Sequence, residues 1–353
     1  MRTTEYILVG QGIAGTLLAF ELMNRGKSVV IVDDPQRSHS SRAAGGIYNP
    51  IVFKRLTRSW MADEVLPVMK EVFTQLESIL EKKLLFPIRI NRILTEVHEQ
   101  ELWQKRARNE LSEFLDPTIH EPEGDLAFLK NNYGTVTDAG YADIASFLSA
   151  SLRYFQQKDS ILTELFNYED LKIEGDACVY KNIHAQKVIF CEGHLASKNP
   201  WFNYIKFKPA KGELLLVHCP QLKLESILTK DFFILPIQDP GFFKVGATYD
   251  WDDLSDSTTE KARTELAEKF RKLIPYPFEV AKQKAGVRPA TIDRRPVIGF
   301  DQKHKNIGIF NGFGTKAVML APFFAKHFCN FMEHKTAMWQ EVDVNRFVNP
   351  VAN

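Results

Sequence analysis

The chain has 353 residues, of which 44% are hydrophobic and 25% are charged, and its formal net charge is +1. Its length exceeds what one ordinary hydrophobic core holds, so we expect two domains, or one large domain with another inserted into it. The composition excludes a disordered or fibrous chain, and the near-neutral charge argues against nucleic acid as the main partner.

The four cysteines are widely spaced, at positions 178, 191, 219 and 329. They form no CxxC pair and have no histidines at metal-ligand spacing, so we predict reduced, partly buried thiols and no metal site. The N-terminus runs into an apolar strand without a signal peptide, and no apolar run approaches the roughly 18 residues of a spanning helix. These features predict a cytoplasmic protein that does not enter a membrane.

Residues 6–34 predict a strand, a glycine-rich turn, a helix and a second strand. The turn, GQGIAG at residues 10–15, matches the pattern GxGxxG, and the surrounding strands and helix make the match specific. In such a turn Gly10 permits the tight bend, Gly12 lets the backbone approach a pyrophosphate, and Gly15 lets the helix pack against the strand. Ile13 and Ala14 supply backbone amides at the helix N-terminus, where the helix dipole stabilises a phosphate.

Asp33 ends the second strand, 18 residues after Gly15. A carboxylate at this place accepts hydrogen bonds from ribose hydroxyls, and its charge repels a 2′-phosphate. Asp34 either shares the adenosine or is solvated. The unit therefore predicts a dinucleotide with an unphosphorylated ribose, without distinguishing a nicotinamide from a flavin.

Residues 38–60, SHSSRAAGGIYNPIVFKRLTRSW, depart from the repeated βα units of a nicotinamide dehydrogenase. The small residues Ala44, Gly45 and Gly46 let the backbone come close to a flat or charged group. A flexible loop is the alternative, but the segment runs directly into the apolar stretch that begins at Ile47. In a flavoprotein the group at this place is the pyrophosphate and ring system of FAD.

The following elements predict a mixed architecture of α/β and antiparallel β. We expect an amphipathic helix over 60–83, strands within 86–97, a strand at 134–138 with a helix over 141–155, and strands at 161–165 and 187–191. Short strands at 213–218, 231–235, 242–248 and 279–287, with a helix over 258–272, predict an antiparallel sheet. Residues 296–331 return to the first domain with a strand and a long helix.

Four segments, in this order, resemble the D-amino-acid oxidase family of FAD-dependent oxidoreductases. They are the opening motif, the loop with Gly45 and Gly46, VIFCEG at 188–193, and GVRPATIDRRPVIGFDQKHKNIGIFNGFGTKAVMLAP at 286–322. That family includes glycine oxidase, monomeric sarcosine oxidase and the flavin domain of the bacterial enzyme that trims the wobble-uridine side chain of tRNA. The resemblance implies a Rossmann-like FAD/NAD(P)-binding domain with an inserted substrate domain of antiparallel sheet plus helices.

The resemblance also implies domain limits and further cofactor contacts. The FAD-binding domain would comprise residues 1–84, 134–208 and 286–353, and the substrate-binding domain residues 85–133 and 209–285. Gly193 would approach the adenosine, and Gly312, Gly314, Thr315 and Lys316 would lie at the flavin ring. No cysteine stands where sarcosine oxidase attaches its flavin, so we expect non-covalent FAD.

Three cations are candidates for catalysis because the flavin supplies the electron chemistry and the protein orients the substrate. Arg288 is placed like the arginine that anchors the substrate carboxylate in glycine oxidase, with a structural ion pair as the alternative. Lys316 resembles the lysine that sarcosine oxidase uses toward the carboxylate, with a contact to flavin or solvent as the alternative. Lys244 resembles the lysine that activates oxygen near flavin N5, although strand alternation also allows it to face solvent.

Three further residues are candidates for substrate binding. Arg55 lies close to where sarcosine oxidase carries an active-site arginine, with a solvated surface residue as the alternative. The strand that carries a substrate-binding tyrosine in glycine oxidase reads DFFILP here, at 231–236, so Tyr249 or Tyr48 would replace that hydroxyl.

These features together predict an FAD-dependent enzyme that oxidises the C–N bond of a small amine or amino acid to an imine, by hydride transfer to flavin N5. Oxygen or another acceptor would take the electrons. Two alternatives stay open, a flavin-dependent tRNA side-chain modification enzyme and a non-catalytic FAD-binding protein.

Overall fold

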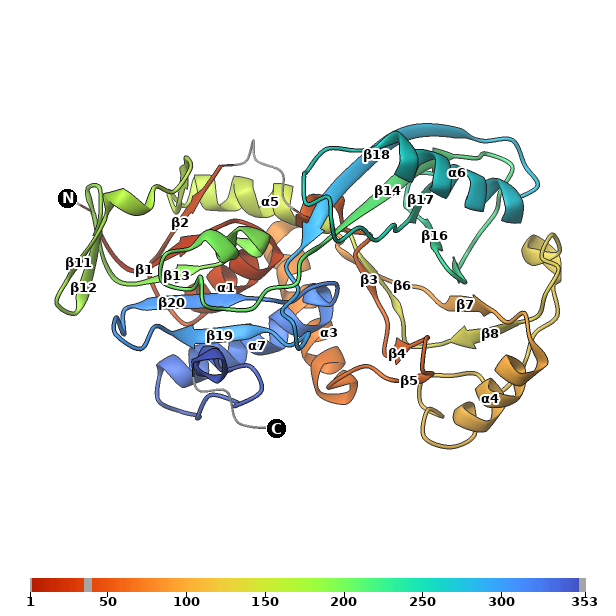
Figure 1. Ribbon diagram of the computed structural model, residues 1–353, viewed down its shortest axis with the longest axis horizontal. Coiled ribbons are helices and arrows are strands. Elements are labelled where there is room, and N and C mark those ends of the chain that lie inside the picture. Colours follow the sequence, from red (N-terminus) through yellow and green to blue (C-terminus); the bar gives the residue numbers. More distant parts are fainter. Residues whose placement is uncertain (1, 35–39, 349–353) are drawn as a thin grey trace.

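A computed structural model describes residues 2–34 and 40–348 of the chain. The chain forms an elongated molecule with two halves, each built on a large β-sheet (Figure 1). An eight-stranded sheet, which contains the first and the last strand of the described chain, forms one half. A seven-stranded sheet forms the other half. The chain crosses between the halves several times, so neither half is one continuous segment.

The eight-stranded sheet has a parallel centre, whose strands carry buried apolar runs that are covered on both faces. The parallel strands are β10 (Ile161–Thr163), β2 (Val29–Asp33), β1 (Arg2–Val9), β13 (Ile183–Phe190) and β20 (Ile307–Asn311). Three antiparallel strands extend this sheet, namely β12 (Ala177–Tyr180), β11 (Leu171–Glu174) and β19 (Val297–Phe300). The carboxyl ends of β1, β2 and β13 meet at one edge, where the glycine turn begins.

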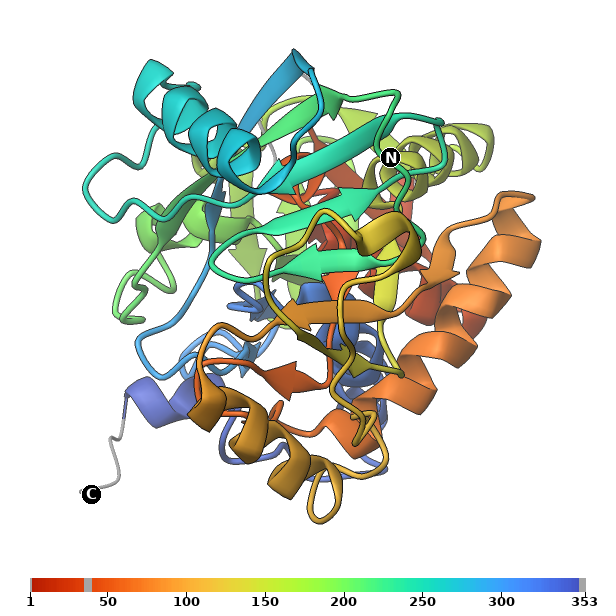
Figure 2. The same ribbon diagram turned by 90° about the vertical axis from the view of Figure 1, so that its right-hand side faces the viewer.

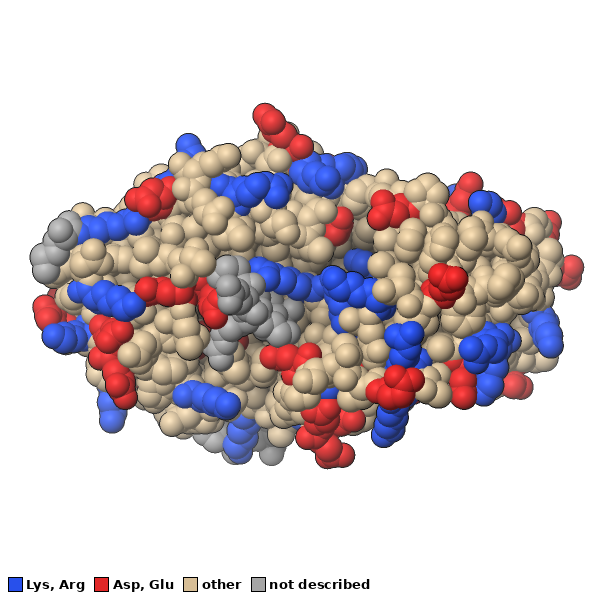
Figure 3. Space-filling view, turned by 90° about the horizontal axis from the view of Figure 1, so that it is seen from above, with Lys and Arg blue, Asp and Glu red and all other residues tan. Residues whose placement is uncertain are grey.

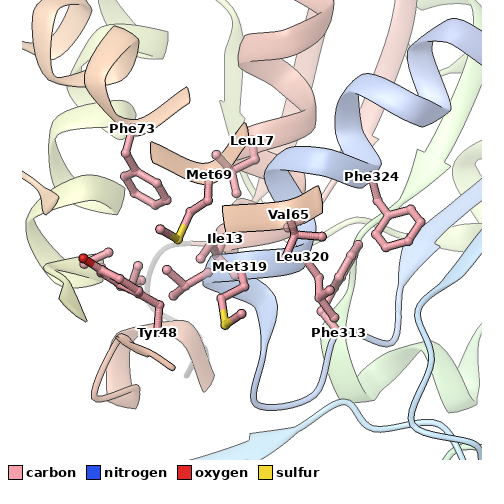
Figure 4. Packing of buried hydrophobic residues seen from close by; sticks show 14 of the residues in the cluster. Ile13, Leu17, Tyr48, Val65, Met69, Phe73, Phe313, Met319, Leu320 and Phe324 are labelled. Carbon is pink, nitrogen blue, oxygen red and sulfur yellow. The ribbon is translucent and has the colours of Figure 1, made fainter. Parts of the chain in front are cut away.

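Four helices pack with this sheet and with one another around a large apolar cluster. They are α1 (Ile13–Asn24), α3 (Ala62–Leu80), α5 (Ile144–Gln157) and α7 (Ala317–Met332). Figure 4 shows α1, α3 and α7 meeting through side chains that include Leu17, Met69 and Leu320. Pro67 is the sixth residue of α3 and has no amide to donate to the Asp63 carbonyl, yet the helix continues past it to Leu80.

The seven-stranded sheet forms the other half and is mostly antiparallel, as predicted (Figure 2). In order its strands are β18 (Glu279–Arg288), β14 (Ala210–His218), β17 (Phe242–Gly246), β16 (Phe233–Pro236), β15 (Ile227–Thr229), β7 (Ile90–Ile93) and β8 (Tyr133–Val136). The pair β15 and β7 is parallel, which the sequence pattern did not indicate. Helix α6 (Glu260–Leu273) covers one face with Leu266 and Phe270, which leaves the other face toward the first half.

Short elements join the two halves. One three-stranded sheet contains β3 (Ile47–Tyr48), β9 (Gly140–Ala142) and β6 (Leu85–Pro87), and β4 (Ile51–Val52) pairs with β5 (Thr57–Arg58). Helix α2 (Ser40–Ala43) packs against β18 and α5, and α4 (Val97–Ala107) lies at the far end of the second half (Figure 1). The strands predicted within 86–97 thus correspond to β6 and β7. The helix that follows them, α4, was not predicted.

The domain limit that we predicted at residue 134 falls inside β8. This strand pairs with β7 along residues 133–136 and belongs to the seven-stranded sheet. A strand cannot be divided from the ladder that satisfies its backbone hydrogen bonds. We therefore propose that the second half continues to about residue 137, and likewise to the end of β18 at Arg288 rather than to residue 285.

The helices in the part of the chain that the structure describes were compared with the requirements of a membrane-spanning segment. None of the helices there combines the length and apolar character needed to cross a bilayer.

Removal of the Phe73 ring is expected to destabilise the first half strongly. The side chain is fully buried in α3, with its ring centroid 5.7 Å from that of Phe147. Phe73→Ala should lower the free energy of unfolding by about 3–5 kcal/mol, measured by urea titration. Val97→Ala, at an exposed site on α4, is the control and should change it by less than about 0.5 kcal/mol. Equal effects of the two substitutions would contradict this packing.

Candidate functional site

A cavity of about 650 Å³ is lined by residues of both halves. One end is formed by the glycine turn after β1 and the end of β2, and the other by β14, β16, β17 and β18 of the seven-stranded sheet. Seen from above, Lys and Arg side chains gather at the middle of the molecule, where the surface is hollowed between the halves (Figure 3). The cavity is therefore placed where a long ligand would contact both sheets.

Close backbone packing explains two glycines of the turn. A Cβ on Gly15 would lie 2.0 Å from the carbonyl oxygen of Gly10, and one on Gly10 would lie 2.7 Å from that of Cys191. Gly10 also has a φ of +107°, which side chains disfavour. Gly15 does not line the cavity itself, so its function is to let α1 approach β1 and β13.

Gly12 has a different environment, although it belongs to the same motif. Its nearest neighbour for an added Cβ is the Ser41 hydroxyl oxygen at 3.4 Å, and it lines the cavity with Ile13 and Ala14. Gly12 is also the N-cap of α1 and provides no side-chain acceptor to the first helical amides. The helix N-terminus therefore faces the cavity, an arrangement that binds phosphate groups.

Asp33 is buried at the end of β2 and lines the cavity together with Asp34. Its Oδ1 accepts a hydrogen bond of 2.9 Å from the Gln11 amide, so the carboxylate is held beside the glycine turn. This is the position that the sequence assigned to a ribose-binding acid.

The loop after β2 lies along the cavity from Ser40 to Ile47, while residues 38 and 39 of the predicted segment lie outside the described residues. The Ile13 amide donates to the Ser41 hydroxyl at 3.2 Å, which ties this loop to the helix N-terminus. Ala44, Gly45, Gly46 and Ile47 all line the cavity. A Cβ on Gly46 would lie 2.0 Å from the Ala142 carbonyl oxygen, so only glycine fits there.

Gly193 and part of the segment that follows β20 also line the cavity. Gly193 has open space around an added Cβ, and its carbonyl accepts from the buried Asn311 side chain at 2.9 Å. Gly314 and Thr315 line the cavity, whereas Gly312 and Lys316 do not. Gly312 instead shapes the turn, with a φ of +80° and its amide bound to the Asn311 side chain.

Some cavity residues were missed by the sequence analysis. Ser41, Asn311, and the pair Tyr168 and Glu192 all belong to the lining, and the Tyr168 hydroxyl donates to Glu192 at 2.5 Å. Glu192 directly precedes Gly193 in the segment VIFCEG, so its place in this motif could have indicated that it lines the cavity. Tyr168 lies in no motif and is brought there only by the fold.

Arg288 is the predicted cation that the structure brings into the cavity wall, which also contains Lys198 and Lys230. Its guanidinium donates to the Lys211 carbonyl at 3.1 Å and to the Thr248 carbonyl at 3.2 Å, and it lies 4.1 Å from the centroid of the Tyr249 ring. Burial lowers the pKa of Arg288, and no ion pair to it is found among the described residues. A Cβ on Gly212 would lie 2.0 Å from Nη2, so glycine at 212 provides the space for the guanidinium.

Two aromatic residues, Tyr249 and Phe233, also belong to the lining. Tyr249 comes just after β17 and is 56% exposed, with its ring over Arg288. Phe233 is half-buried on β16 and lies so close to Gly45 that a Cβ there would be 2.9 Å from its ring. An apolar ring thus meets the glycine loop at this point of the lining.

Lys244 lies on the cavity side of the seven-stranded sheet without lining the cavity. Its neighbour Val245 points into the apolar cluster under α6, so alternation directs Lys244 to the other face, as for the lining residue Gly246. The side chain is half-buried, and burial lowers its pKa, as does the nearby charge of Lys284, whereas Asp143 opposes both. The predicted alternative of a solvated lysine does not describe this environment.

The other three predicted substrate residues lie away from the lining. Lys316 is the N-cap of α7, where burial and the charge of Arg295 lower its pKa. Tyr48 is fully buried, and Figure 4 shows it packed beside the core helices. Arg55 is exposed in the turn between β4 and β5. Among the predicted cations, only Arg288 contributes to the cavity wall.

All four cysteines are free and buried, which confirms the prediction of reduced thiols. Cys191 lines the cavity, and burial raises its pKa far above the ordinary range, so its thiol stays protonated. A protonated thiol is a poor nucleophile, which is consistent with a cofactor held without a covalent bond. Within residues 2–34 and 40–348, no group of three or more His, Cys, Asp or Glu is placed to hold a metal ion.

The donors and spaces of this cavity fit a flavin dinucleotide. A helix N-terminus, a carboxylate at the end of β2 and open space at Gly12 and Gly193 lie along one wall. The family model for DAO, FAD dependent oxidoreductase, matches residues 5–330 of the chain. The chain belongs to this family. It is therefore an oxidoreductase, and its cofactor is FAD.

Curated relatives cover the chain almost completely or in large part. It is 22% identical to the glycine oxidase of Bacillus licheniformis over 90% of both chains. It is also 25% identical to the tRNA 5-methylaminomethyl-2-thiouridine biosynthesis bifunctional protein MnmC of Leptospira interrogans, over 83% of this chain and 47% of that protein. The chain thus spans about half the length of the latter relative.

A solved structure agrees with the fold over the whole chain. The L-proline dehydrogenase from P. horikoshii is similar with a TM-score of 0.80 and 16% sequence identity, and the match covers 100% of both chains. This likeness confirms the predicted fold class of a Rossmann-like half combined with an antiparallel substrate half.

A side chain at residue 12 is expected to weaken FAD binding without unfolding the protein. In Gly12→Ala the methyl group meets no protein atom closer than 3.4 Å but enters the cavity at the helix N-terminus. We expect FAD affinity to fall at least tenfold, or about 1.4 kcal/mol, in equilibrium titrations of the apoprotein. The unfolding free energy of the apoprotein should stay within about 0.5 kcal/mol of the unsubstituted chain.

Gly15→Ala provides the contrast because its methyl group collides with the Gly10 carbonyl and not with a ligand. That variant should lose stability even without FAD. If Gly12→Ala binds FAD normally, the pyrophosphate does not lie at this helix terminus.

Proposed function

We propose that this protein oxidises the C–N bond of a small amine or amino acid to an imine, which water then hydrolyses. In this reaction the carbon loses a hydride, the nitrogen loses a proton, and two electrons leave on oxygen or another acceptor. FAD, when bound, supplies the hydride acceptor. The observation that carries the proposal is the Arg288 guanidinium in the cavity wall, whose partners among the described residues are two carbonyl groups and an aromatic ring.

Arg288 would bind the carboxylate of the substrate. A half-buried guanidinium without a carboxylate partner among the described residues is costly, and a ligand carboxylate would offset that cost through two parallel hydrogen bonds. The two carbonyl acceptors and the Tyr249 ring hold the planar group in one orientation. An amino acid held there would have its α-carbon within the same cavity as the residues proposed to bind FAD.

The residues around Arg288 would position the substrate and exclude water. Phe233, Leu214 and Gly246 present an apolar surface of the seven-stranded sheet to the cavity, next to Gly45. Exclusion of water strengthens the electrostatic contact to Arg288 and protects the reacting carbon from solvent. Phe233 offers no hydroxyl, so in this proposal the carboxylate is held by Arg288 with Tyr249 beside it.

Lys244 would act on the electron-acceptor side of the reaction. Its half-buried ammonium faces the same side of the sheet as the cavity wall, close to Asp143 and Lys284. A cation there would stabilise the negative charge that develops when oxygen is reduced. Lys316, at the start of α7, would act through the helix terminus rather than by contact with the carboxylate.

A modified uridine of tRNA is the second candidate substrate, supported by the similarity to MnmC over 318 residues. Its side chain would present an amine to the same cavity. The net charge of +1 favours a small molecule over a polyanion. A salt-sensitive mobility shift with tRNA would favour the uridine instead.

Arg288→Met is expected to reduce turnover of amino acids while FAD stays bound. Loss of the guanidinium should lower kcat/KM by roughly 30-fold or more, because a charge-assisted contact to a carboxylate is worth about 2 kcal/mol or more. The check is steady-state imine hydrolysis, followed as released carbonyl product, for the amino acid that reacts fastest. Arg55→Met, at an exposed arginine outside the cavity, is the control and should keep kcat/KM within twofold. Equal losses in both variants would contradict the proposed anchor.

A further inference from the structure

Two exposed aromatic side chains form a stacked pair at the edge of the cavity. The exposed fractions are 56% for Tyr249 and 58% for Trp251, and their ring centroids lie 5.9 Å apart at an interplanar angle of 28°. Large aromatic groups exposed side by side are a common feature of binding sites, because a ligand that covers them removes apolar surface from water. Tyr249 lines the cavity, and Trp251, which is not part of the lining, stacks against it.

An ion pair made by a buried lysine holds the segment that carries these rings. Lys211 is almost completely buried, and its ammonium binds Asp253 and, at 3.2 Å, the Ser255 hydroxyl. This contact lowers the pKa of Asp253 to about 2. The Asp250 side chain also accepts hydrogen bonds from the amides of residues 252 and 253. These contacts therefore hold the segment 249–255 against β14.

The same lysine connects the aromatic pair to the carboxylate anchor. The backbone of Lys211 exchanges hydrogen bonds of 2.8 and 3.0 Å with Asp250, between the two aromatic residues. Its carbonyl oxygen also accepts from Arg288 at 3.1 Å. One residue of β14 thus sets the position of both rings relative to the guanidinium, which lies 4.1 Å from the Tyr249 ring.

We propose that Tyr249 and Trp251 form a platform that binds an aromatic group of the substrate a few bonds away from the carboxylate held by Arg288. The preferred substrates are then amino acids with an aromatic substituent, rather than glycine or alanine. The inference rests on the proposed function in taking Arg288 as the carboxylate anchor. A ring that stacks on Trp251 buries apolar area from both partners and is already adjacent to the cavity.

The test uses two unreactive carboxylates, phenylacetate and acetate, as probes of the FAD-loaded protein. Calorimetric titration gives the Kd of each, and the ratio of the two values measures the contribution of the ring. We expect phenylacetate to bind roughly tenfold more tightly than acetate. Trp251→Ala should remove most of this preference and leave the Kd of acetate within twofold, whereas Trp251→Phe should retain it.

Two further variants locate the effect. Val97→Ala removes an exposed apolar side chain from α4 and should leave the ratio unchanged. Arg288→Met should weaken both probes, since both carboxylates bind there. An unchanged preference in Trp251→Ala, or normal phenylacetate binding in Arg288→Met, overturns the proposal. Because the probes bind without turnover, a failure of every amino acid to react would count against the proposed function and leave this result intact.

Discussion

The burial of one guanidinium constrains the whole substrate end of the molecule. Arg288 reaches the cavity wall because residue 212 is glycine, and it is held there by the carbonyl groups of Lys211 and Thr248. A charge removed from water requires compensation, and two carbonyls with an aromatic ring provide only part of it. The strand partners β14 and β18, the cavity wall and the segment with Tyr249 are all arranged around this group.

The cofactor end was predictable from the sequence because it depends on local backbone geometry. Gly10, Gly15 and Gly46 are required where a Cβ would meet a carbonyl carbon or oxygen, and such requirements leave a motif in the chain. Asp33 is the last residue of a strand that the apolar run before it predicts, and one helix sets its distance in sequence from the turn. The fold class followed from the same units and from the change to short strands after residue 210.

Side-chain direction and strand pairing were less predictable because they depend on contacts between distant segments. Tyr48 lies two residues after Gly46 but points into the core, and Lys316 stays outside the lining although Thr315 and Ala317 on either side of it belong to it. Strand β8 joins the second half through its pairing with β7, although the sequence after it resembles the start of a βα unit. The sequence did not predict that Trp251 is exposed, since large aromatic side chains are mostly buried.

The central claim is that an amino acid bound at Arg288 loses a hydride from its α-carbon. The most direct measurement is anaerobic rapid mixing of the yellow FAD-loaded protein with a panel of amino acids and N-alkyl amines, with each reactive compound repeated in its α-deuterated form. The account predicts that at least one amino acid bleaches the flavin absorbance, and that deuterium slows the bleaching severalfold. Persistence of the yellow colour with every compound would contradict it, as would bleaching that is indifferent to deuterium at the α-carbon.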